Sequence, residues 1–86
     1  MRDIVIETAD FVDGENKKWE LWYFINEHDG GAYGIKIERK SEEERLAEYT
    51  LGLSHSYEEV EGWVKMMAAR GVTPLALHDV ADELVG

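Results

Sequence analysis

The sequence predicts an α+β fold, an antiparallel four-stranded meander sheet with two C-terminal helices packed on one face. Segments with strand-like alternation come first and segments with helical spacing come last. Turn-forming residues separate the strand-like segments at hairpin distances, and both helical segments begin at N-terminal signals. Because 86 residues leave room for one hydrophobic core, residues 1–86 are predicted to form a single domain.

The first predicted hairpin joins residues 3–12 to residues 17–26 through the turn residues Asp13 and Gly14. The second segment alternates most clearly between two faces. One face carries Trp19, Leu21, Tyr23 and Ile25. The other face carries Glu20, Trp22, Phe24 and Asn26.

Residues 33–38 are predicted to form the third strand after a turn at Gly30 and Gly31, and residues 47–53 the fourth. Ser41 and Glu44 have capping-box spacing, which predicts one helical turn in the loop between these strands. The alternation places Tyr49, Leu51 and Leu53 on the core face.

Ser56 and Glu59 have the same capping-box spacing and predict a helix over residues 57–70 that ends at Gly71. Thr73 and Pro74 predict a second, terminal helix, with Thr73 as its N-cap and proline at its first helical position. Both helices are expected to cover the apolar face of the sheet.

Composition excludes several classes of function. The chain has 19 acidic and 9 basic residues, a balance that disfavours direct binding to a nucleic-acid backbone. It has no cysteine, which excludes disulfides and thiolate metal sites and favours the cytoplasm. Neither an export signal nor an apolar run of membrane-spanning length is present in the sequence, so no membrane role is predicted.

Trp22 and Phe24 point away from the predicted core and are the first candidate binding residues. Two large aromatic side chains on a face without helices suggest a surface for a ligand, a partner or a second copy of the chain. The alternative is cross-strand packing, in which these rings cover the backbone at Gly34 and Gly52.

Glu42, Glu43 and Glu44 form the second candidate, an acidic loop suited to a basic protein partner. A further alternative is that the acidic clusters imitate a nucleic-acid backbone and inhibit a basic nucleic-acid-binding protein. Ordinary solubility explains the same charges without any partner.

The three histidines predict neither a metal site nor a catalytic centre. His78 and Asp82 share a helix face, but two ligands do not make a site, and nothing in the sequence brings His28 or His55 to them. No catalytic residue, metal or cofactor is therefore predicted. A small enzyme or ligand-binding protein would need a pocket between sheet and helices, near His55 or His78.

Three segments resemble a family of short uncharacterised bacterial proteins, a domain of unknown function found in Gram-positive anaerobes. They are Ala32–Glu38, His55–Val60 and the run from Val72 through Thr73-Pro74-Leu75 to His78-Asp79-Val80. The resemblance extends from about Trp19 onward and implies a bacterial cytoplasmic source. It carries no activity or site residue to this chain.

The biochemical function is unknown from sequence, and the leading hypothesis is a non-enzymatic protein-interaction or regulatory module. The chain is expected to be a monomer or a homodimer, and its partner another protein.

Overall fold

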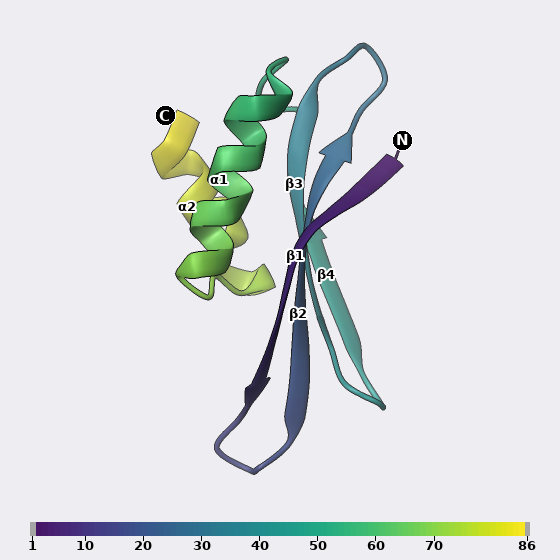
Figure 1. Cartoon of the computed structure of the whole chain (residues 1–86), viewed down its shortest axis with the longest axis vertical. Helices are drawn as coiled ribbons and strands as arrows, with labels where there is room; N and C mark the ends of the chain where they lie inside the picture. The colour runs from purple at the N-terminus through teal and green to yellow at the C-terminus, as the bar shows by residue number, and fades with distance from the viewer. Residues whose placement is uncertain (1, 86) are drawn as a thin grey trace.

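The structure is a computed structural model that describes residues 2–85. Four strands form one antiparallel sheet in the order β1-β2-β3-β4, and the helices pack on one face of it (Figure 1). The elements are β1 Arg2–Val12, β2 Lys18–Glu27, β3 Tyr33–Lys40, β4 Arg45–Tyr49, α1 Tyr57–Ala69, the 3₁₀ turn η1 Pro74–Ala76 and α2 Leu77–Val85. The predicted α+β meander is confirmed.

The core lies between the helices and the central strands β2 and β3. Its fully buried members are Tyr23, Ile25, Ile35, Ile37, Val60, Val64, Met67 and Leu77. The core face predicted for β2 and β3 is therefore correct. Tyr23 also donates a hydrogen bond from its hydroxyl to the carbonyl oxygen of Val72, at 2.8 Å, and burial raises its pKa above 10.0.

The fourth strand differs from its prediction in both position and face. It begins earlier, at Arg45, and Tyr49 lies opposite Lys36 on the face away from the helices. The side chains of Tyr49 and Leu51 are 56% and 81% exposed, so their assignment to the core was wrong. A one-residue change of register moves every side chain of a strand to the other face.

Regular strand pairing stops at Tyr49 because Thr50 keeps one backbone bond to β3, from its N–H to the carbonyl oxygen of Ile35 at 2.8 Å, and makes the other through its side chain. The backbone N–H of Ile35 donates to the hydroxyl of Thr50 at 2.9 Å, and that hydroxyl donates to the carbonyl oxygen of Leu51 at 2.7 Å. Residues 51–53 therefore continue irregularly, which the alternation of Leu51 and Leu53 does not reveal.

A β-bulge interrupts the pairing of β1 with β2 between Val5 and Glu7. Ile4 and Ile6 pack against the core, whereas Thr8, which continues their alternation in the sequence, lies opposite Trp22 on the other face. One inserted residue thus reverses the alternation for the second half of the strand.

The helix starts are confirmed for α1 and corrected for α2. Ser56 accepts a hydrogen bond from the backbone N–H of Glu59 at 3.2 Å, as the capping box predicts. Thr73 makes no side-chain capping bond, and Pro74 opens a 3₁₀ turn instead of the second helix. That helix, α2, begins at Leu77.

The helical layer covers only part of the sheet. α1 contacts β1, β2 and β3, while η1 contacts β3 and β4. The β1–β2 and β3–β4 hairpins extend beyond the helices, toward the lower end of the molecule in Figure 1. We call the face opposite the helices, to which Trp22 and Phe24 belong, the open face. Within residues 2–85, no helix has both the length and the apolarity needed to cross a membrane.

Adding a methyl group at Gly34 is expected to destabilise the fold. A Cβ atom there would lie 2.6 Å from the carbonyl oxygen of Leu51 and 2.7 Å from the hydroxyl of Thr50. Gly34→Ala should lower the free energy of unfolding by about 1–3 kcal/mol, measured by urea titration. Gly62→Ala in α1, where the new atom meets open space, should instead raise it by about 0.5–1 kcal/mol. Equal effects at the two positions would contradict this packing.

Candidate binding cleft between the hairpins

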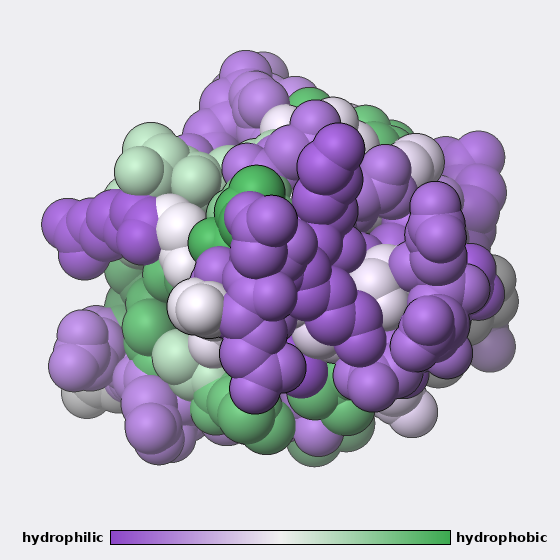
Figure 2. Space-filling model, turned by 90° about the horizontal axis from the view of Figure 1, so that it is seen from below, coloured by the Kyte–Doolittle hydropathy of each residue, from purple (hydrophilic) through white to green (hydrophobic). Residues whose placement is uncertain are grey.

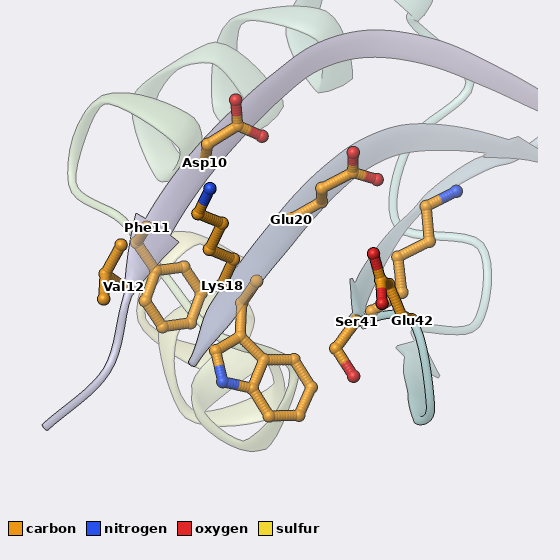
Figure 3. A pocket seen from close by; sticks show the side chains of 9 residues that line it. Asp10, Phe11, Val12, Lys18, Glu20, Ser41 and Glu42 are labelled. Carbon is orange, nitrogen blue, oxygen red and sulfur yellow. The ribbon is translucent and has the colours of Figure 1, made fainter. Parts of the chain in front are cut away.

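A cleft opens where the two hairpins separate. Pairing between β2 and β3 ends with Glu20 opposite Lys40, and the chain on either side diverges beyond that pair. The space between has a volume of about 580 Å³. We call this space the hairpin cleft (Figure 3). It is lined by Asp10, Phe11, Val12, Lys18, Trp19, Glu20, Lys40, Ser41 and Glu42.

Asp13 organises the wall formed by the β1–β2 hairpin. Its carboxylate accepts hydrogen bonds from the backbone N–H groups of Glu15 and Lys17 at 2.9 and 3.0 Å, and from the indole of Trp19 at 2.8 Å. These bonds, the indole first among them, hold the pKa of Asp13 below its ordinary value of 3.8. Trp19 in turn stacks on Phe11, with ring centroids 6.5 Å apart. The wall is thus fixed without help from a helix.

Ser41 organises the opposite wall. Its hydroxyl accepts hydrogen bonds from the backbone N–H groups of Glu43 and Glu44 at 3.3 and 3.1 Å, and its own N–H donates to the carbonyl oxygen of Glu44. The segment is a hairpin turn, so the predicted helical turn was wrong although Ser41 does act as a cap. Figure 3 shows Ser41 and Glu42 across the cleft from Asp10, Phe11 and Val12.

An ion pair joins the two hairpins near their tips. Lys17 Nζ lies 3.4 Å from a carboxylate oxygen of Glu44 and 4.6 Å from the centre of the Trp19 ring. A second hollow of about 280 Å³ lies beside the cleft, and the two share Lys18, Ser41 and Glu42. Because this ion pair is exposed, it is worth at most about 1 kcal/mol and leaves the hairpins free to separate further.

The charged groups of this end that lack an ion-pair partner are mostly carboxylates. Within residues 2–85, Asp10, Glu42 and Glu43 make no ion pair, and neither does Lys18, whereas Lys17 is paired with Glu44. Lys40 lies 3.9 Å from a carboxylate oxygen of Glu38 and 3.8 Å from the centre of the Trp22 ring. Figure 2 views the molecule from this end and shows a mostly hydrophilic surface with smaller hydrophobic areas between.

The predicted aromatic candidates lie on the open face, as their alternation indicates, but lysines cover them. Trp22 and Phe24 stack on each other with centroids 6.3 Å apart. Lys36 Nζ lies 4.9 Å from the centre of the Phe24 ring, and Lys40 covers Trp22. Phe24 is only 8% exposed. Cross-strand packing therefore accounts for Phe24, although the residues directly opposite the pair are Lys36 and Glu38 rather than glycines.

Glu20 and Lys40 connect the aromatic pair to the cleft. The indole of Trp22 donates a hydrogen bond to Glu20 at 3.1 Å, and both Glu20 and Lys40 line the cleft. Of the predicted binding residues, Glu42 lines both hollows, Glu43 lines only the second, and Glu44 pairs with Lys17. Asp10, Val12 and Lys18 were not predicted, since nothing in their alternation marks where two hairpins part.

The histidines lie away from the hairpin cleft. His78 Nε2 is 3.7 Å from a carboxylate oxygen of Glu48, and His28 packs against Gly34 with its Nε2 buried and without a hydrogen-bond partner. The residues that the structure describes contain no group of three or more His, Asp or Glu side chains placed to hold a metal ion. The cleft lies between the β1–β2 and β3–β4 hairpins. The pocket that the sequence analysis considered lay elsewhere, between sheet and helices near His55 or His78.

Replacing Asp13 should destabilise the hairpin in a pH-dependent way. A carboxyl whose pKa is lower in the folded state stabilises the fold above its unfolded pKa of 3.8 and loses this effect as pH falls through the folded value. Asp13→Asn should therefore unfold at lower urea than the native chain near neutral pH, and the difference should shrink below about pH 3.8.

Asp82→Asn, which changes an exposed carboxylate on α2, is the matched control for this measurement. It should shift the unfolding free energy by less than about 0.5 kcal/mol near neutral pH. A difference for Asp13→Asn that stays constant from neutral to acidic pH would show that its charge does not hold the hairpin.

Comparison with known proteins identifies a family but no activity. No curated protein and no solved structure is similar enough to the chain to count as a match. Residues 2–86 match a family described as a family of unknown function, DUF6514. The resemblance seen in the sequence to a domain of unknown function is thereby supported. Since the match covers almost the whole sequence, the chain belongs to the DUF6514 family.

Proposed function

We propose that the chain is a non-enzymatic protein-interaction module that binds a short basic segment of another protein in the hairpin cleft. The observation that carries the proposal is the chemistry of the cleft, in which unpaired carboxylates stand beside an apolar wall. Asp10 and Glu42 supply negative charge, while Phe11, Val12 and Trp19 supply apolar surface. An arginine or lysine side chain combines a cationic head with an apolar stem and matches both.

The size of the cleft limits what it holds. About 580 Å³ lies within the range of sites for small ligands and corresponds to a few side chains, not to the surface of a folded domain. Both walls are held by internal hydrogen bonds, through Asp13 and Ser41, so binding does not first require ordering of the loops. A short extended segment is therefore the occupant that best fits the cleft.

The setting we propose is the cytoplasm of a Gram-positive anaerobic bacterium. The absence of cysteine from the sequence and the resemblance to short bacterial proteins support it.

Selection of peptides on the purified protein tests the proposal. A displayed library of random linear peptides should yield binders rich in lysine or arginine next to apolar residues. In two-dimensional NMR, a selected peptide should shift the signals of the Trp19 indole, Val12 and Ser41. Replacing its cationic residues by glutamine should weaken binding about tenfold or more, equivalent to ~1.4 kcal/mol.

A pair of charge reversals separates the cleft from general attraction to an acidic protein. Glu42→Lys with Glu43→Lys should weaken the selected peptide about tenfold. Asp82→Lys with Glu83→Lys on α2 changes the net charge equally but lies away from the cleft, and should leave affinity within about twofold. Equal losses in both variants would mean that net charge alone attracts the peptide. Selection of only neutral peptides, or of none, would overturn the proposal and favour a small-molecule ligand for the cleft.

A further inference from the structure

The open face is electrically neutral, although the chain carries a net charge of −10. Strand register and side-chain alternation place four cations and four carboxylates on it. The cations are Lys18, Lys36, Lys40 and Arg45. The carboxylates are Asp3, Asp10, Glu20 and Glu38. The acidic excess therefore lies on the helices, edges and loops, so two open faces do not repel each other through net charge.

Acidic and basic side chains are segregated along one row of the open face, whereas Lys18 on β2 and Glu38 on β3 lie outside this row. The row crosses the whole sheet, because Asp10 lies opposite Glu20, Glu20 opposite Lys40, and Lys40 opposite Arg45. Its acidic half belongs to β1 and β2, and its basic half to β3 and β4. A partner surface of uniform charge would meet like charge along half of this row.

A second copy of the chain, related by a two-fold axis, places an opposite charge against every member of the row. An axis parallel to the strands and between β2 and β3 lays β1 of one copy over β4 of the other. Asp10 then faces Arg45, and Glu20 faces Lys40, with each contact occurring twice. We propose that the open face is the interface of a homodimer of this chain.

The apolar side chains of the open face support the same arrangement. Val5 lies opposite Phe24 in β2, and Tyr49 lies at the other end of that row, opposite Lys36. Val5 and Tyr49 are 48% and 56% exposed in the single chain. The two-fold axis brings Val5 of one copy onto Tyr49 of the other, which removes both from water. Two-fold symmetry thus pairs Val5 with Tyr49 in this row and acid with base in the row that contains Asp10.

The size of the face sets the strength of the dimer. The four strands have 11, 10, 8 and 5 residues. With strands about 4.8 Å apart and about 3.3 Å per residue, the face measures roughly 500 Å². A standard interface buries about 800 Å² on each partner. The dimer is therefore expected to be weak, with a dissociation constant of roughly micromolar to hundreds of micromolar, and to depend on concentration.

Sedimentation velocity with two charge-reversal variants tests the dimer without any ligand. In the dimer, position 10 of one copy faces position 45 of the other. Asp10→Arg therefore sets base against base there, and Arg45→Glu sets acid against acid, so each variant alone should be monomeric. Mixed in equal amounts, they should form a heterodimer, because each reversed edge meets the opposite charge. The native chain should show a concentration-dependent dimer, and its dissociation constant should rise about tenfold or more in each variant.

Controls separate the test from changes in folding and in net charge. Asp82→Arg on α2 makes the same change of net charge as Asp10→Arg and should dimerise like the native chain. Circular dichroism should show an unchanged fold in every variant. A native chain that stays monomeric up to about 1 mM, or a dimer unaffected by both reversals, would overturn the proposal. Neither result would bear on peptide binding in the cleft, because no peptide is present.

Discussion

The hydrogen bond from the Tyr23 hydroxyl to the Val72 carbonyl oxygen links the two layers of the fold at a fully buried position. Tyr23 lies in the middle of β2, and Val72 lies in the connection between α1 and η1. The bond therefore fixes the end of α1 against the centre of the sheet. A buried hydroxyl without this partner would cost about 1–3 kcal/mol, so the two layers are coupled by more than apolar contact.

The helices leave part of the sheet uncovered, and side chains of the sheet itself cover that part. The helices do not reach the lower end of the sheet in Figure 1, so the tips of the β1–β2 and β3–β4 hairpins have no second layer over them. Asp13 and Ser41 compensate by binding the backbone of their own turns, and Trp19 is covered by Phe11, Lys17 and Arg39 instead of by a helix. On the open face, lysine stems take the same role over Trp22 and Phe24. The cleft and the open face are thus both consequences of a sheet larger than its helical cover.

Sequence patterns predicted the fold where one periodicity holds along a whole element. β2 and β3 keep their alternation, and α1 begins at its Ser56 cap, so all three were placed correctly. The pattern failed where a single group redirects the chain: the bulge after Val5 and the hydroxyl of Thr50 each change which face follows. Of the cleft residues, the sequence had singled out only Glu42 as a binding candidate, as part of an acidic loop, since the cleft itself depends on where β2–β3 pairing ends. That end point is a property of three-dimensional pairing and leaves no local signal.

The distribution of charge allows a strongly acidic chain both to attract a basic segment and to associate with itself. Were the net charge of −10 spread evenly, two copies would repel at any face. The open face instead carries equal numbers of acidic and basic side chains, and one of its rows sets Asp10 and Glu20 on β1 and β2 against Lys40 and Arg45 on β3 and β4. A two-fold axis along the strands would also bring both hairpin clefts to the same end of the dimer. Because Asp10 lines the cleft and also faces Arg45 of the second copy, binding of a basic segment and self-association would draw on the same carboxylate.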